Sequence, residues 1–132
     1  MTLTKEKATV DDYMKLPEGG KYQLIDGEII EMASPIFTHQ QLLALIFWKL
    51  FTVNQSNKLG ELITAPFVVH FDEENIFQPD ILFVSKERFS IIDKWINGAP
   101  DVAIEILSPA TAYNDSHKKF HIYEKYGVKE YF

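Results

Sequence analysis

The sequence predicts a single domain in which helices are combined with β-strands. Short apolar runs rich in β-branched and aromatic residues recur along the chain, and two longer segments have the lengths of helices. At 132 residues the chain can bury a sizeable core, and no linker, repeat or low-complexity segment divides it. Residues 1–132 are therefore expected to form one domain.

The composition is that of an ordinary globular protein, with 46% hydrophobic and 24% charged residues. The formal charge is 13 − 19 = −6, which argues mildly against a partner held by non-specific phosphate contacts. Residues 117–129 nevertheless carry four lysines and two histidines against one acid. Because the local field governs the docking of a polyanion, the charge evidence is neutral on nucleic acid.

Compartment is indicated by residue usage. The chain has no cysteine, which excludes disulfides and thiolate metal sites and fits a reducing cytoplasm. The first ten residues are polar, unlike a signal peptide. The longest apolar stretch, residues 42–53, contains Lys49 and is too short to cross a bilayer. We therefore expect a cytoplasmic protein with no membrane partner.

Cap and turn residues mark a helix and a hairpin at the beginning of the chain. Thr9 is a suitable N-cap for a short helix within residues 1–16. Asp26-Gly27 separates two strand-like runs, residues 21–25 and 28–32, and this dipeptide is the strongest short signal for a β-hairpin.

A long helix is predicted next. Ser34-Pro35 supplies an N-cap and a proline at the first helical position, and the helix is expected to continue to about Asn57. It is apolar nearly all round over residues 42–53, with Trp48 among them. Such a helix is covered on more than one side, by the same chain or by another copy. We therefore expect a homodimer or a larger assembly.

Strand patterns dominate the second half of the chain. Residues 62–71 and 76–84 are expected to pair as a second hairpin around a turn at residues 72–75, with Pro66 at a bulge or an edge. The remaining expected elements are a short helix at residues 86–92, a strand that stops at Ser108-Pro109, a helix from about Asn114 to Tyr126 with Gly127 as its C-cap, and the beginning of a strand at residues 128–132.

Two acidic residues interrupt apolar, strand-like runs. Asp80 lies within residues 78–84 and Glu105 within residues 101–107. A buried carboxylate is costly unless it is paired, protonated or bound to a metal. Two carboxylates on neighbouring strands repel each other, and a divalent cation between them relieves the repulsion. The pattern favours a metal-dependent enzyme.

The last predicted helix carries an aromatic stripe centred near Tyr123. At about 100° per residue, Lys119 lies within roughly 40° of that centre, whereas Lys118 lies roughly 140° away. We therefore expect Lys118 on the surface and Lys119 pointing inward, where it can reach the two acids. Asp115, one turn earlier, falls near the same face and could pair with Lys119.

These residues together resemble the PD-(D/E)XK nuclease superfamily, in particular the Uma-two family of restriction-endonuclease-like proteins. The matching stretches are residues 22–28, Ser34-Pro35 to His39, Ala65-Pro66-Phe67, Gln78-Pro79-Asp80, Ala99-Pro100-Asp101, Glu105 to Pro109, Asp115, Lys119, Tyr123, Gly127-Val128 and Glu130-Tyr131. They cover nearly the whole chain.

The resemblance implies an α/β, restriction-endonuclease-like core with a central mixed β-sheet flanked by helices. It implies a Mg²⁺ or Mn²⁺ ion on Asp80 and Glu105 for the hydrolysis of phosphodiester bonds, with DNA as the expected substrate. Relatives also continue well past Glu130-Tyr131, so the C-terminal strands are expected to be truncated here.

Two site positions depart from the family pattern. The superfamily lysine two residues after the second acid is absent because Leu107 stands there, and the family pattern implies that Lys119 replaces it. Relatives usually carry glutamate where this chain has Gln23, so one acid that could assist metal binding is missing.

Each candidate residue also has a non-catalytic explanation. Asp80 could cap a turn, Glu105 could pair with Lys119 without metal, and Lys119 could extend its stem along the core with a solvated head. Gln23 could hydrogen-bond a water of the metal site or occupy a strand face. His39 could touch substrate or form a hydrogen bond at the start of the long helix.

Three functions are compatible with this pattern. The first is a metal-dependent DNA endonuclease, with Asp80, Glu105 and Lys119 as catalytic residues. The second is a weak or inactive nuclease-fold domain that binds nucleic acid or a protein partner. The third is another metal-assisted phosphate hydrolase. His117 and His121 have a metal-ligand spacing but are expected on a solvated face, and Tyr123 and Tyr126 are expected in the core.

Overall fold

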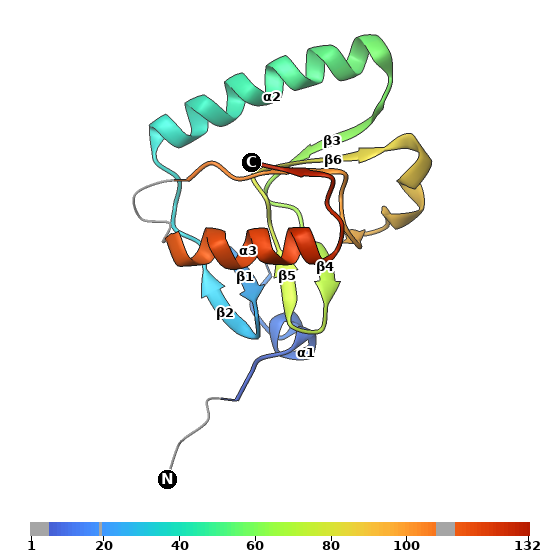
Figure 1. Ribbon diagram of the computed structural model, residues 1–132. Helices are drawn as coiled ribbons and strands as arrows, with labels where there is room; N and C mark the ends of the chain where they lie inside the picture. Colours follow the sequence, from blue (N-terminus) through green and yellow to red (C-terminus); the bar gives the residue numbers. More distant parts are fainter. Residues whose placement is uncertain (1–5, 19, 108–112) are drawn as a thin grey trace.

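The strands form two mixed sheets flanked by helices. The computed structural model describes residues 6–18, 20–107 and 113–132, without the side chains of residues 113–115 (Figure 1). Its elements are, in chain order, α1 (Val10–Met14), β1 (Tyr22–Ile25), β2 (Glu28–Glu31), α2 (Phe37–Asn57), β3 (Gly60–Thr64), β4 (Val69–Asp72), β5 (Asn75–Phe77), β6 (Ile81–Ser85), the 3₁₀ helix η1 (Lys86–Ile91), β7 (Ile96–Asn97), β8 (Val102–Ile104), α3 (Tyr113–Lys125) and β9 (Glu130–Tyr131).

One sheet has five strands in the order β2-β1-β5-β4-β7, and the other has four in the order β3-β6-β8-β9. Each contains one parallel pair, β4 with β7 and β8 with β9, among antiparallel ones. The predicted α/β class with mixed strand pairing is confirmed, and the strands are divided between two sheets.

The first hairpin is confirmed at the predicted turn. β1 and β2 pair antiparallel, with Ile25 opposite Glu28. Asp26 and Gly27 both have positive φ, 49° and 76°, as a two-residue hairpin turn requires. The N-cap of α1 is also confirmed, because the backbone N–H of Thr9 donates to the Asp12 carboxylate at 2.9 Å.

Two predicted strands were too long. Residues 62–71 and residues 76–84 each divide between the two sheets, so the predicted hairpin survives only as β4 with β5. Pro66 has no N–H to continue a ladder and lies between β3 and β4. The segments that connect the two sheets, residues 65–68 and 78–80, lie side by side, because the N–H of Ala65 donates to the carbonyl of Asp80 at 3.0 Å. Asp80 therefore precedes β6 instead of lying within a strand.

The long helix ends at Asn57 as predicted, but its start was predicted wrongly. The chain stays extended through Ile36 (φ −85°, ψ 164°), which is the N-cap, so Ser34 and Pro35 precede the helix. At the other end Lys58, and no glycine, takes the left-handed conformation with φ 49°.

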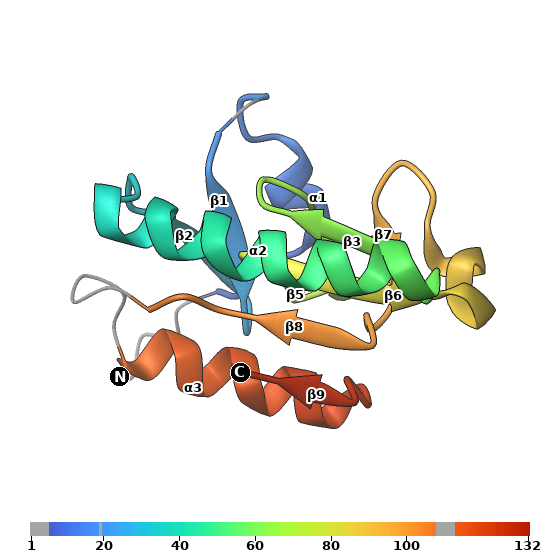
Figure 2. The same cartoon turned by 90° about the horizontal axis from the view of Figure 1, so that it is seen from above.

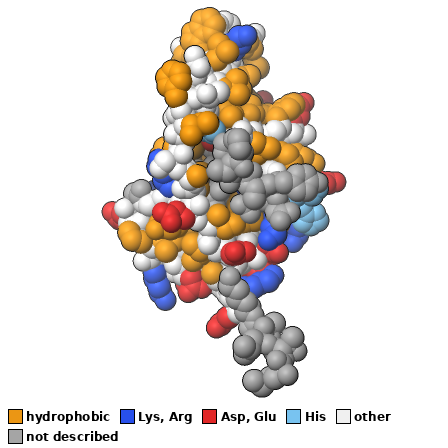
Figure 3. Space-filling model, turned by 90° about the vertical axis from the view of Figure 1, so that its left-hand side faces the viewer, with side chains coloured by type: hydrophobic (Ala, Val, Ile, Leu, Met, Phe, Trp, Pro, Cys, Tyr) orange, Lys and Arg blue, Asp and Glu red, His pale blue; other side chains and the backbone are white. Residues whose placement is uncertain are grey.

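α2 lies along β3 at one side of the molecule (Figures 1 and 2). None of its 21 residues is buried, although most are apolar. Figure 3 shows hydrophobic side chains gathered over this end of the molecule. Its exposed large apolar side chains are Phe37, Leu42, Leu45, Trp48, Leu50, Phe51 and Val53. The expected second cover of this helix is therefore not provided by the described residues of a single chain.

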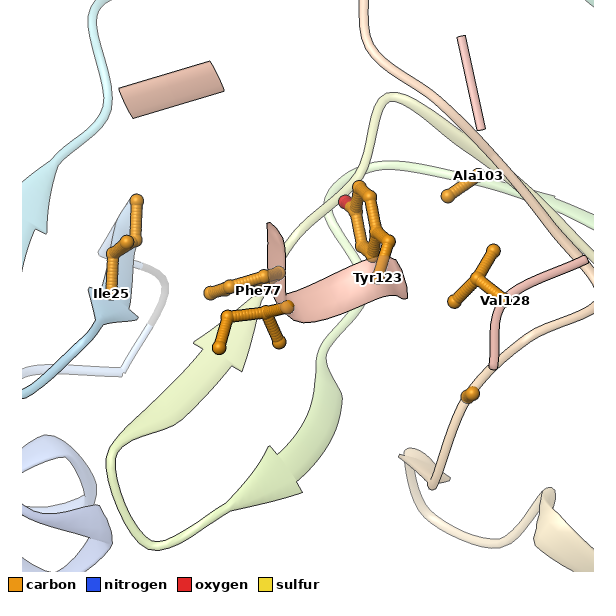
Figure 4. Close-up of a cluster of buried hydrophobic side chains, with 7 residues drawn as sticks. Ile25, Phe77, Ala103, Tyr123 and Val128 are labelled. Carbon is orange, nitrogen blue, oxygen red and sulfur yellow. The ribbon is translucent and has the colours of Figure 1, made fainter. Parts of the chain in front are cut away.

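α3 packs Tyr123 into the main core (Figure 4), and Phe120 packs against the same cluster. Tyr123 is fully buried against Phe77 from β5, with ring centroids 5.6 Å apart. Gly127 follows the helix with φ 78°, which confirms the predicted C-cap. The core assignment of Tyr126 was wrong, because the residue is 36% exposed and its hydroxyl donates to Asp72.

Candidate active site

Strand register brings the two predicted acids together. β6 and β8 are antiparallel neighbours, with Ile81 opposite Ile104. Continued by one residue, this register sets Asp80 opposite Glu105, each just outside its strand. The backbone N–H of Ile106 donates to Asp80 Oδ2 at 2.6 Å, which ties the two segments at this point.

His39 binds the free side of the Asp80 carboxylate. Its Nε2 lies 3.3 Å from Asp80 Oδ1, and its Nδ1 lies 2.9 Å from Gln40 Oε1. The side chains of His39 and Asp80 are 14% and 13% exposed, so this contact is largely shielded from solvent. The first turn of α2 thus orients one of the two acids.

Lys119 reaches the site from α3, as the helical wheel predicted. Its Nζ forms an ion pair with Glu105 Oε1 and donates to Gln23 Oε1 at 2.8 Å. It is 5% exposed, whereas Lys118 is exposed. The Lys119 ammonium also lies 5.3 Å from the centre of the Phe77 ring, a distance at which the ring face attracts a cation.

Gln23 lies in the same network, on the buried part of β1. Its Oε1 also accepts the backbone N–H of Gln78 at 2.8 Å. Gln23 therefore fixes both the lysine and the segment that leads to Asp80, a role that neither sequence alternative described.

Tyr123 also contacts the candidate site, although the sequence predicted only a core position for it. Its hydroxyl donates to Glu105 Oε1 at 2.6 Å, on the oxygen that Lys119 also contacts. Burial, with the negative charges of Glu105 and Asp80, raises the pKa of Tyr123 well above its ordinary value. The phenol therefore stays protonated and acts as a donor. Its spacing from Lys119, four residues on one helix face, was the available sequence signal.

Asp80, Glu105, Lys119, Gln23 and His39 line a cleft of about 510 Å³. Its walls include the segment before α2, the first turns of that helix, Ala65-Pro66 and the residues around Glu105. The acids are therefore shielded but reachable, which is the setting expected of a catalytic cleft.

The remaining candidates lie outside the described residues or on the exposed face of α3. The side chain of Asp115 lies outside the described residues, as do Ser108 and Pro109. His117 and His121 are exposed on the other side of α3, as expected.

The donor set can be compared with the needs of a metal. Within the described ranges, no three or more His, Asp or Glu side chains are grouped to hold an ion, and the chain has no cysteine. Two adjacent carboxylates do offer the hard oxygen ligands that Mg²⁺ and Mn²⁺ prefer, and these cations keep several waters. The residues fit a divalent cation held by Asp80 and Glu105, with Lys119 as a neighbouring positive charge.

The fold and the acid pair define the class as a restriction-endonuclease-like α/β domain. The chain belongs to the Uma2 family, described as "Putative restriction endonuclease", whose model matches residues 10–132. No functionally curated protein matches it. Among the helices that the structure describes, none is long and apolar enough to cross a membrane.

A solved structure supports the fold. It is a "putative nuclease belonging to DUF820" from Anabaena variabilis, which superposes with a TM-score of 0.74 at 24% sequence identity. The match covers 86% of this chain and 66% of that one, so this chain spans about two thirds of the length of the longer protein.

Proposed function

We propose that the protein is a metal-dependent nuclease that hydrolyses phosphodiester bonds in DNA. The observation that supports this most is that Asp80 and Glu105 lie opposite each other in the lining of a cleft, beside the buried ammonium of Lys119. The family description supports the same class of reaction.

Asp80 and Glu105 would hold Mg²⁺ or Mn²⁺. When bound, such a cation supplies a Lewis acid and lowers the pKa of water. His39 and the N–H of Ile106 orient Asp80, while Tyr123 orients Glu105. Lys119 carries a fixed positive charge at the place where negative charge develops on the phosphate, and charge placed in advance lowers the barrier.

The test is cleavage of plasmid DNA with Mg²⁺ or Mn²⁺. We expect wild type to nick or linearise the plasmid, and Asp80→Asn and Glu105→Gln to lose at least about 100-fold in rate. Glu87→Gln, which removes an exposed acid on η1, is the matched control and should cut normally. Equal rates for all four proteins, or no metal-dependent cutting by wild type, would refute the proposal.

A second candidate is a nuclease-fold domain that binds nucleic acid or protein without cutting. The observation that favours it is the Lys119 ion pair with Glu105, completed by Gln23, because this network is satisfied without any metal. A domain of this kind would bind DNA equally well with and without Mn²⁺ and would release no cleaved product.

We also propose that α2 is covered by a second copy of the chain. Phe37, Trp48 and Phe51 are 79%, 64% and 42% exposed. Since aromatic side chains present about 150–250 Å² each, these three alone expose roughly 350 Å². Two copies, with the neighbouring leucines, approach the roughly 1,200 Å² that the smaller stable interfaces bury.

A further inference from the structure

A second hollow, which we call the aromatic pocket, adjoins the catalytic cleft. It has a volume of about 460 Å³, and its aromatic lining is Tyr13, Tyr22, Phe67 and Trp95. Pro66 and Gln78 line both this pocket and the cleft, so the two hollows share a wall. Nothing in the proposed chemistry of the acid pair uses the pocket.

Hydrogen bonds hold the pocket in shape. The Tyr13 hydroxyl donates to the carbonyl of Tyr22 at 3.0 Å. The Gln78 amide donates to the same carbonyl at 2.8 Å, and its nitrogen lies 3.4 Å from the Tyr13 hydroxyl. The N–H of Asp93 donates to the carbonyl of Trp95 at 3.0 Å. The pocket is therefore largely formed before any ligand arrives, as is usual for binding sites.

The four rings come from separate segments and keep part of their surface exposed around one space. The rings at the centre of the core, Phe77 and Tyr123, are instead fully buried, and one of the four pocket rings, Phe67, also packs against the smaller core cluster. The charged residues at the pocket, Lys94 and Glu18, are of opposite sign. The pocket is therefore suited to a flat, uncharged ring and offers little net attraction to a phosphate.

We infer that the aromatic pocket binds an unpaired nucleobase of the strand whose phosphate lies at Asp80 and Glu105. This inference rests on the proposed nuclease function. Gln78 lines both hollows and Asp80, two residues later, lines the cleft, so their Cα atoms are no more than about 7 Å apart. Neighbouring nucleotides of one strand can therefore lie in the two hollows. A base can enter the pocket only when it is unpaired, so the preferred substrate is single-stranded or locally opened DNA.

The expected gain in affinity follows from the stacking of one base on the aromatic rings. One stacked base contributes about 5- to 150-fold in affinity and tolerates any base, because every base has a π-face. The inference therefore predicts that single strands bind more tightly than duplex DNA and with little sequence preference. It also accounts for a nucleic-acid site on a chain of net charge −6, since part of the affinity comes from stacking.

The two tryptophans make a matched test possible. Trp95 lines the pocket, whereas Trp48 lies 64% exposed on α2 and does not line it. Trp48→Phe and Trp95→Phe each leave one tryptophan, whose emission reports on one place. Each variant is titrated, in the absence of divalent cations, with a 12-nucleotide oligothymidylate and with an abasic strand of the same length. Fluorescence anisotropy of the labelled strands measures binding.

We expect the oligothymidylate to quench Trp95 emission in Trp48→Phe and to leave Trp48 emission unchanged in Trp95→Phe. The abasic strand should bind at least about 10-fold more weakly, and Trp95→Ala should lose a similar factor for the oligothymidylate only. Unchanged Trp95 emission at saturation, equal affinity for the two strands, no binding of either strand, or free thymidine binding as tightly as the oligonucleotide would each overturn the inference.

Plasmid cleavage by the same preparations separates this result from the proposed function. If the protein cuts in a metal-dependent way but Trp95 emission does not change, only the pocket assignment is refuted. If Trp95 emission is quenched but no DNA is cut, the proposed nuclease activity is refuted, and the pocket remains the binding site of a non-catalytic domain.

Discussion

The helices α2 and α3 differ in how much their sequences say about their surroundings. α3 alternates a buried stripe with a polar face, and Tyr123 is fully buried while its neighbour Glu124 is exposed. α2 is apolar nearly all round over residues 42–53, where Lys49 is the one charged residue, and none of its residues is buried. The difference between the apolar and polar faces of a helix shows which side faces the core, whereas the overall hydrophobicity of the helix does not. The charged group on the inner face of α3 could therefore be identified, whereas the cover of α2 could not.

The largest effect on cleavage rate and stability is expected for Lys119, one of two adjacent lysines in α3. Lys119→Met should lower the cleavage rate by about 10²- to 10³-fold, because it removes a fixed charge next to the reacting phosphate. It should also destabilise the metal-free protein by about 3–5 kcal/mol, since the buried Glu105 loses its partner. Plasmid cleavage and thermal melting measure both.

Lys118→Met is the control, since it removes the same charge from the exposed face. It should keep the melting temperature and lose little activity, with the loss masked by salt. Mn²⁺ should recover part of the stability of Lys119→Met by binding the folded state. Similar behaviour of the two variants would show that Lys119 is not a site residue.

The next effect concerns Tyr123 in α3 and Tyr126, the residue that follows this helix. Tyr123→Phe removes the hydroxyl that orients Glu105 and should cost about 1–3 kcal/mol of stability, because a buried acceptor loses a donor. If Tyr123 positions the acid, Mn²⁺ affinity should fall about 10-fold as well. Differential scanning calorimetry and isothermal titration measure the two losses.

Tyr126→Phe removes a hydroxyl bound to Asp72 on the surface. That hydrogen bond raises the pKa of Tyr126 to about 12, but its exposure limits the contribution to stability. Its Mn²⁺ affinity should equal that of wild type. A loss of metal affinity in both variants would point to a general loosening of α3.

A substitution on α2 is expected to have the smallest effect on the free energy of unfolding and the largest effect on assembly. Trp48→Ser removes an exposed ring, so the free energy of unfolding of a single chain should change by no more than about 0.5 kcal/mol. Light scattering should give a dimer for wild type and a shift toward monomer for the variant. A wild-type mass of 15.3 kDa at micromolar concentration would contradict the proposed second cover.

Local signals predicted much of the fold. The Asp26-Gly27 hairpin and the Gly127 cap follow from backbone preferences of single residues, and these hold in any context. The division of residues 62–71 and 76–84 between two sheets was not predictable, because alternation of side chains describes a strand and not the sheet it joins.

The candidate site could be predicted where a charged residue fell among apolar positions. Asp80, Glu105 and Lys119 were identified for that reason, and the structure brings them together. Tyr123 was missed because an aromatic residue in a buried stripe is consistent with packing alone. Its hydroxyl becomes informative only when the position of Glu105 is known.

Calorimetric titration of Mn²⁺ tests the central claim most directly, because it asks whether Asp80 and Glu105 form one metal site. We expect wild type and Glu87→Gln to bind one ion with the same affinity. Asp80→Asn should bind on the order of 100-fold more weakly, or give no heat, because a carboxylate ligand is lost. Equal heats for wild type and Asp80→Asn would contradict the metal site and the nuclease mechanism built on it.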